Sequence, residues 1–149
     1  MKLCLVCSSG GHFFQLRSLN ALWHRHDRFW VTFSSQDTSS LLGDEKVFWA
    51  YQPTNRNIKN LIKNTFLAVK ILRAERPDAI ISTGAGVAVP FLYMGRLMGV
   101  KTIYIESLTR VNDLSLSGKL VYPIVDKMLV QWPQLAGRYK KALFQGQVV

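Results

Sequence analysis

Residues 2–12, KLCLVCSSGGH, place an apolar run directly before two glycines and a histidine. The run from residue 2 to residue 8 has the length and composition of a buried β-strand, and the residues after it have the pattern of a helix. Two adjacent glycines give up side-chain packing and cost backbone entropy, so this junction requires positive φ angles or close approach by another group. We expect a strand, a tight turn and a helix, with a ligand as the simplest group to approach the turn.

The same order of short apolar strand and helical segment continues along the chain. Further strands are expected at 28–33, 46–51, 78–83, 101–106 and 126–132, and the last residues, 143–149, resemble one more strand. Helical patterns occupy 12–24, 56–75 and 87–98. This alternation predicts an α/β fold, a Rossmann-like, doubly wound and mainly parallel sheet with helices on both faces. No linker, internal repeat or low-complexity tract divides the chain, so we expect a single domain over residues 1–149.

The charge of the chain favours an anionic partner. Nineteen basic residues against nine acidic ones give a formal charge of +10, which suits nucleic acid, a phosphorylated substrate or an anionic membrane surface. A basic nucleic-acid-binding or phosphorylated-ligand-binding module is therefore an alternative function. Its usual recognition signatures are absent and the basic residues are spread along the chain, so we expect no nucleic-acid partner.

Composition also limits the compartment and the metal chemistry. No run of about 18 apolar residues and no signal peptide occurs, so we expect a protein that does not span a membrane. Cys4 and Cys7 lie three apart on the first expected strand, where their side chains point to opposite faces. They are interpreted as two packed free thiols rather than a zinc or redox pair, which suits a reducing cytoplasm.

Three loops that follow expected strands carry candidate functional residues. In the first, the amides of Ser9, Gly10 and Gly11 at a helix start would form an anion-binding concavity, and His12 could form a hydrogen bond or move a proton. The alternative is a tight turn in which His12 caps the helix. Because ligands of open parallel sheets gather at the carboxyl ends of the strands, the other two loops should lie nearby.

The second and third loops differ in their chemistry. Residues 82–90, STGAGVAVP, contain Gly84 and Gly86, which permit close approach of a ligand or serve helix–sheet packing alone. The third loop, IESLTRVNDLSLSGK, begins after a strand and offers a carboxylate, hydroxyls and cations, and an exposed polar loop is its alternative. Its candidate residues are Glu106, Ser107, Thr109, Arg110, Ser115, Ser117 and Lys119.

Taken together, these loops resemble one glycosyltransferase subunit family over nearly the whole chain. The matching segments are CSSGGHFFQL, STGAGVAVPF, YIESLTRVNDLSLSGKLVYPIVDKMLVQWPQLAGRY and FQGQVV. The family is the acceptor-side, membrane-recruiting subunit of the two-component UDP-N-acetylglucosamine transferase of N-glycan assembly, with its bacterial capsule and exopolysaccharide relatives. More distantly, the pattern is similar to the N-terminal half of the GT-B enzyme that forms lipid II. The chain is therefore expected to end where a larger enzyme would continue.

The resemblance implies a split enzyme. This chain would supply the N-terminal half of a GT-B transferase, and a separate small subunit would supply the C-terminal, donor-binding half, so that the active cleft lies between them. The heterodimer would transfer a sugar from a UDP-sugar to a polyprenyl-diphosphate-linked acceptor in polysaccharide or glycan assembly. No cofactor is expected, and no metal, since such sites do not usually use one and the chain contains no D-x-D motif.

Roles for individual residues follow from the resemblance together with the loop chemistry. His12 and Glu106 are the general-base candidates, and proton transfer and substrate positioning remain open for both. Gly84 and Gly86 would form the second wall of the cleft, while the amides of Gly10 and Gly11 would face phosphate. Polar or phosphate groups would be held by Ser107, Arg110 and Lys119, although Arg110 could instead pair with Asp113 or Glu106.

The helix at 56–75 is the candidate membrane surface. On a helical wheel an apolar stripe forms the expected core face, basic residues group beside it, and two apolar residues are left over. This arrangement suits peripheral docking on the cytoplasmic face of an anionic membrane. The stripe is Ile58, Leu61, Ile62, Val69 and Leu72, and the basic group is Lys59, Lys63, Lys70 and Arg73. Leu67 and Ile71 fall outside both sets. The alternative is a solvated face on which Leu67 and Ile71 touch a neighbouring helix.

Overall fold

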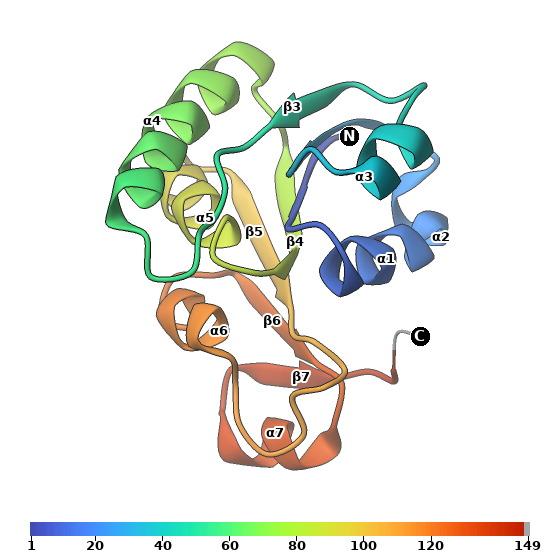
Figure 1. Cartoon of the computed structure of the whole chain (residues 1–149). Coiled ribbons are helices and arrows are strands. Elements are labelled where there is room, and N and C mark those ends of the chain that lie inside the picture. Colours follow the sequence, from blue (N-terminus) through green and yellow to red (C-terminus); the bar gives the residue numbers. More distant parts are fainter. Residues whose placement is uncertain (148–149) are drawn as a thin grey trace.

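A parallel sheet of seven strands organises the computed structural model, which describes residues 1–147 (Figure 1). The strands lie in the order β3-β2-β1-β4-β5-β6-β7, and every adjacent pair is parallel. They are β1 (Lys2–Cys7), β2 (Asp27–Thr32), β3 (Val47–Trp49), β4 (Ala79–Gly84), β5 (Lys101–Ile105), β6 (Lys127–Val130) and β7 (Ala142–Phe144). The predicted Rossmann-like α/β class is confirmed. The strand order reverses between β1 and β4, the place where such sheets bind ligands.

Helices cover both faces of this sheet. Figure 1 shows α1, α2 and α3 on one side, with α4 and α5 on the other. The described helices are α1 (Gly11–Ser18), α2 (Asn20–Trp23), α3 (Gln36–Leu41), α4 (Ile58–Glu75), α5 (Ala88–Leu97), α6 (Leu116–Val121) and α7 (Pro133–Arg138). Alternate residues of β1 enter two separate cores, Cys4 with Val6 and Leu5 with Cys7. Both cysteines are free and buried on opposite faces, as expected, and burial raises the pKa of the Cys7 thiol to about 12.

Several boundaries differ from the sequence expectation. The helix expected at 12–24 is divided at Leu19 into α1 and α2, because the indole of Trp23 turns back to donate to the Leu16 carbonyl at 2.9 Å. The short helices α3, α6 and α7 were not expected, since six residues are too few to display a helical period. Of the expected strand 143–149, β7 includes residues 143 and 144, and residues 148–149 lie outside the described part.

The face that α4 buries is not the predicted stripe. Ile58, Leu61 and Ile62 are exposed, whereas Ile71, which the wheel left outside, is buried against the sheet. The buried positions are Asn64, Ala68, Ile71 and Leu72. Leu67, also left outside, packs partly buried against this core. The prediction of the buried stripe was therefore wrong for its first three members.

A buried asparagine lies on the core face of α4. Asn64 accepts a hydrogen bond from the Tyr51 amide at 2.9 Å and donates to the Tyr51 carbonyl at 3.0 Å. This pairing satisfies the backbone of the chain leaving β3, so a polar side chain occupies the core face of the helix. Ile58 and Ile62 of the predicted stripe lie on the exposed side of the helix. No helix within residues 1–147 has both the length and the apolar composition to cross a bilayer.

Candidate functional site

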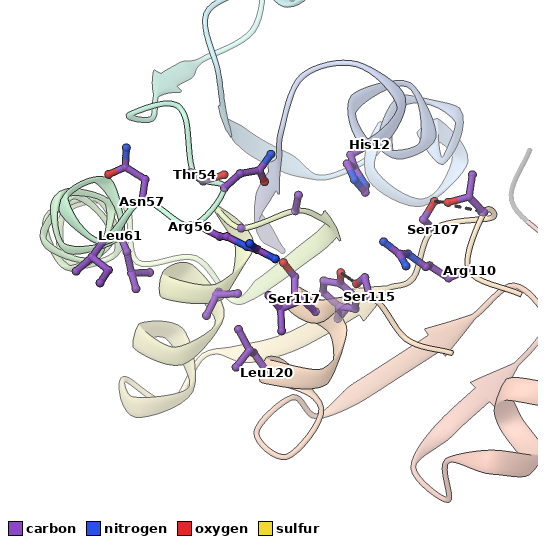
Figure 2. A pocket seen from close by; sticks show the side chains of 18 residues that line it. His12, Thr54, Arg56, Asn57, Leu61, Ser107, Arg110, Ser115, Ser117 and Leu120 are labelled. Carbon is purple, nitrogen blue, oxygen red and sulfur yellow. Dashed lines mark hydrogen bonds between the residues drawn. The ribbon is translucent and has the colours of Figure 1, made fainter. Parts of the chain in front are cut away.

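A cavity of about 810 Å³ opens at the carboxyl ends of the strands. Its walls come from the loops after β3, β4 and β5, together with residues of α1, α4, α5 and α6 (Figure 2). Among the predicted site residues, those that line it are His12, Gly86, Ser107 and Arg110. Thr109, Ser115 and Ser117 from the third loop also contribute. The fold thus brings the three predicted loops to one place.

His12 is locked to the end of β4. Its Nδ1 lies 2.7 Å from the Thr83 carbonyl, and the Thr83 hydroxyl donates to the His12 carbonyl at 2.6 Å. A carbonyl oxygen only accepts, so in the neutral imidazole Nδ1 carries the proton and Nε2 carries the lone pair. Gly10, at φ +80°, occupies the N-cap of α1, and no side chain in the described part of the chain caps this helix. His12 is therefore not a helix cap, and its imidazole is oriented as a base would need.

The glycines of the second loop make room for neighbouring side chains. Gly84 has φ +110°, and a Cβ there would lie 3.0 Å from Cε1 and Nδ1 of His12. A Cβ on Gly86 would lie 3.0 Å from the Thr54 hydroxyl. Gly84 thus permits the close packing of His12 on β4, and Gly86 forms part of the cavity wall. Ser9, Gly10 and Gly11 stand next to His12 but do not line the cavity, so phosphate binding by their amides stays a prediction.

Glu106 lies behind the cavity wall rather than in it. The side chain is fully buried, and its Oε1 accepts a hydrogen bond from the Ser107 amide at 2.9 Å. Its Oε2 accepts from both the amide and the hydroxyl of Ser115, each at 2.9 Å. The Ser115 hydroxyl in turn caps α6 by accepting from the Gly118 amide at 3.0 Å. These contacts give Glu106 the geometry of a positioning residue for the third loop.

The cations of the site divide into paired and unpaired groups. Lys119 Nζ pairs with Asp113 at 2.8 Å and does not line the cavity, so phosphate binding by Lys119 stays a prediction. Lys119, followed by the Tyr139 hydroxyl, holds the pKa of Asp113 well below its usual range. Arg110 pairs with neither Asp113 nor Glu106, the two alternatives. Its guanidinium faces the cavity (Figure 2).

Arg56 and Tyr104 are cavity residues that sequence reasoning missed. Arg56 enters from the loop between β3 and α4, which carried no recognisable motif beyond a cation after a strand. Tyr104 was hidden inside β5, and its hydroxyl lies 3.3 Å from that of Ser115. Burial, followed by the Glu106 charge, raises the pKa of Tyr104, so it lines the site as a neutral hydroxyl.

The opposite end of the cavity is apolar. Ile58 and Leu61 of α4, Val89 of α5, and Leu116 and Leu120 of α6 line it. Figure 2 shows the leucines of α4 and α6 on the side of the cavity away from His12. Within residues 1–147 no three His, Cys, Asp or Glu side chains gather closely enough to hold a metal ion. The arrangement suits an amphipathic, anionic ligand and a histidine that accepts a proton from it.

Comparisons with known proteins identify the family of the chain. Residues 45–148 match the family described as "Oligosaccharide biosynthesis protein Alg14 like". A UDP-N-acetylglucosamine transferase subunit ALG14 from Yarrowia lipolytica is 33% identical over 179 aligned positions, which cover 99% of this chain and 81% of the relative. The human UDP-N-acetylglucosamine transferase subunit ALG14 is 26% identical, and the alignment covers 100% of this chain and 83% of the human protein.

Among solved structures, MurG of Acinetobacter baumannii superposes with a TM-score of 0.74 at 17% identity. The match covers 90% of this chain and 43% of MurG, so the chain corresponds to less than half of that molecule. At this identity the likeness concerns the fold. It agrees with the expected Rossmann-like α/β class.

Proposed function

Because the chain belongs to the Alg14 family of oligosaccharide biosynthesis proteins, we propose that it is the acceptor-binding subunit of a UDP-N-acetylglucosamine transferase. Its partner is a small catalytic subunit that binds most of the UDP-sugar. The curated relatives are named as transferase subunits, which supports a second subunit. The acceptor is a polyprenyl-diphosphate-linked sugar, and the proposal assigns no metal or other cofactor.

The observation that carries this proposal is His12 at the wall of a cavity with two arginines, Arg56 and Arg110, that form no ion pair within residues 1–147. In the proposed reaction the acceptor hydroxyl gives its proton to Nε2 of His12 while its oxygen bonds to the sugar's anomeric carbon. The bond from that carbon to the diphosphate breaks, and UDP leaves with the electron pair. The Thr83 carbonyl stabilises the imidazolium that forms, since Nδ1–H already donates to it.

The proposal includes a peripheral position on the cytoplasmic face of a membrane. Lys59, Lys63, Lys70 and Arg73 lie on α4, and no carboxylate of residues 1–147 forms an ion pair with them. Ile58, Ile62 and Phe66 form an exposed apolar row on the same helix. A basic group beside an apolar row supports docking on an anionic bilayer, which would keep the lipid acceptor close to the cavity.

The test is reconstitution of transfer from separate subunits. The purified chain should transfer negligible sugar from UDP-N-acetylglucosamine to a polyprenyl-diphosphate acceptor, and addition of the partner should restore turnover. Co-purification should show a complex of the two chains. Robust turnover by this chain alone would contradict the two-subunit proposal, and a complex that uses no UDP-sugar would contradict the transferase activity.

A further inference from the structure

We propose that the cavity holds the acceptor by its lipid end, with the diphosphate between Arg56 and Arg110 and the first isoprene units between α4 and α6. The assignment rests on the proposed function and deepens it. It names a residue, Arg56, and an apolar wall that no sequence motif indicated.

The charges of the two arginines are uncompensated. Arg56 and Arg110 reach one cavity from loops more than fifty residues apart, and neither guanidinium forms an ion pair or hydrogen bond with residues 1–147. Like charges that share a cavity repel one another, and an anion between them removes this cost. Guanidinium groups bind phosphate oxygens with paired hydrogen bonds, and a diphosphate has enough oxygens for both arginines.

Both arginines project from loops that the fold holds in place. Arg56 has a positive φ of +49°, which a non-glycine residue adopts only where its surroundings impose it. The surroundings here are Asn57, which caps α4 through the Asn60 amide at 3.0 Å, and the Asn60 side chain, which donates to the Pro53 carbonyl at 2.7 Å. The guanidinium is therefore aimed at the cavity by a built turn.

The loop of Arg110 is supported from behind. The Arg110 amide donates to the Ser107 carbonyl at 3.0 Å, and the indole of Trp132 donates to the Leu108 carbonyl at 2.7 Å. Glu106 anchors both ends of the loop through Ser107 and Ser115. This support presets the position of Arg110 and lowers the entropy lost when an anion binds.

The apolar end of the cavity favours a ligand that carries a hydrocarbon chain beside its diphosphate. Ile58 and Leu116 are 72% and 68% exposed, and Leu61 and Leu120 are also exposed. Exposed apolar side chains that line one cavity lose contact with water when a hydrocarbon occupies it. A nucleotide or a free phosphosugar has no hydrocarbon chain beside its phosphates, whereas a prenyl diphosphate has one.

The apolar wall is fixed and continues toward the proposed membrane face. The Tyr93 hydroxyl donates to the Leu120 carbonyl at 2.6 Å and thereby ties α6 to α5. On α4 the exposed row extends from Ile58 to Ile62 and Phe66, beside the lysines of the proposed docking surface. A prenyl chain leaving the cavity at Ile58 therefore passes onto the surface that would touch the bilayer.

Calorimetry with short soluble probes tests the proposal on the full chain. Farnesyl diphosphate should bind more tightly than inorganic pyrophosphate, because only the former reaches the apolar wall. Arg56→Gln should weaken both probes by about tenfold, the loss expected for one charge-assisted contact. The double variant Ile58→Asn/Leu116→Asn should weaken farnesyl diphosphate by about tenfold and leave pyrophosphate unchanged, since about 55 Å² of apolar contact is worth that factor.

Matched controls exclude general effects of charge and exposure. Arg25→Gln removes an exposed cation from the opposite side of the sheet, and Leu97→Asn removes an apolar side chain that is 78% exposed at the end of α5. Both variants should bind the two probes like the parent chain. Circular dichroism should give the same melting temperature for all these surface variants.

Three results would overturn the proposal: equal affinity of farnesyl diphosphate and pyrophosphate, parental binding by Arg56→Gln, or equally tight binding of a short-chain phosphatidylglycerol. The last would assign the site to membrane headgroups in general. Because these measurements need neither partner nor UDP-sugar, they are independent of the transferase test. A reconstituted complex without transfer, together with the expected probe affinities, would refute the proposed function and leave the lipid-diphosphate site standing.

Discussion

At the scale of single residues, the site depends on buried backbone groups that orient its functional side chains. The Thr83 carbonyl selects the tautomer of His12, and the amides of Ser107 and Ser115 satisfy the hydrogen-bonding capacity of the buried Glu106 carboxylate. Two residues that looked equivalent in sequence as base candidates thus have different surroundings. His12 has a free ring nitrogen at the cavity, and both Glu106 oxygens are engaged by the chain itself.

Removal of the His12 imidazole should abolish proton transfer without disturbing the fold. In the reconstituted transferase, His12→Ala should lower kcat by about 10²–10⁴-fold, the usual contribution of a general base. Complex formation and the melting temperature should remain close to those of the parent. His24→Ala is the control, because this histidine is exposed at the end of α2. A parental rate for His12→Ala would show that His12 has no chemical role.

Glu106→Gln separates positioning from proton transfer. An amide nitrogen would face either the Ser107 amide or the Ser115 donors, so the variant should lose about 1–3 kcal/mol of unfolding free energy in urea titrations. With the partner present, the KM for acceptor should rise more than kcat falls. A drop in kcat of about a hundredfold or more with unchanged KM and stability would instead identify Glu106 as the base.

A second variant reaches the same contact without changing a charge. A Cβ at Gly118 would overlap Oε2 of Glu106, so Gly118→Ala should displace the carboxylate or α6. We expect the same rise in KM for acceptor as in Glu106→Gln. Gly137→Ala in α7 is the control, since a Cβ at Gly137 would meet no heavy atom of residues 1–147 within 4 Å beyond its own helix. Parental kinetics in Gly118→Ala would show that the Glu106 contact does not position the loop.

At the scale of elements, α4 serves the fold with one face and exposes the other. Its core face consists of four buried residues, and two of them, Asn64 and Ala68, are not large apolar side chains. The wider outer face carries the exposed apolar row and the four basic residues. Ile58 and Ile62, which the helical wheel assigned to the core, are thus available to a membrane. Their exposure supports the hypothesis that α4 itself contacts the bilayer.

Charge reversal on α4 tests this docking surface. Lys59, Lys63 and Lys70 changed together to Glu alter the local charge by about six units and should strongly weaken sedimentation with anionic vesicles at physiological salt. Binding to neutral vesicles should change little. Turnover of a water-soluble acceptor analogue should persist, because none of the three lysines lines the cavity.

The control reverses the same charge at the opposite edge of the sheet. Lys101, Lys127 and Lys140 are exposed and lie near the amino ends of β5, β6 and β7. Their replacement by Glu should reduce vesicle binding far less than the α4 variant does. Equal losses in the two triple variants would show that net charge, and not α4, recruits the chain.

At the scale of the whole molecule, one carboxylate joins three parts of the fold. Glu75 at the end of α4 lies 2.7 Å from Lys2 Nζ of β1 and 2.5 Å from Lys46 Nζ, which precedes β3. Hydrogen bonds from Lys2 and then from Lys46 lower the pKa of Glu75. The folded state therefore binds the Glu75 proton more weakly than the unfolded chain does.

The pH dependence of stability follows from this sign. The contribution of Glu75 is complete above its unfolded pKa near 4.5 and is lost as the pH falls through the lower folded value. Urea titrations from neutral to acid pH should show a fall in unfolding free energy at the acid end. Glu75→Gln should lose about 1 kcal/mol at neutral pH and show a shallower acid fall. If the unfolding free energy of Glu75→Gln falls as steeply at acid pH as that of the parent, the acid dependence comes from other carboxylates.

The sequence alone determined the class of the fold and the position of the site along the chain. The hydrophobic patterns of strands and helices are local properties of the sequence. The alternation of strands and helices from β1 to β6 could therefore be predicted, as could the turn with Gly10 before His12. Parallel strands place their following loops at one edge, and this rule placed the three loops together. The resemblance to a transferase subunit family rested on those same loops.

Tertiary structure decided which residues of those loops face the ligand. Whether Arg110 pairs, whether Glu106 reaches the cavity and which face of α4 is buried depend on groups far away in sequence, such as Tyr51 for Asn64 and Ser115 for Glu106. Arg56 lines the site because the turn after β3, which Asn57 and Asn60 support, places it there. Burial and pairing are properties of contacts across the fold, and a periodic pattern along the chain does not contain them.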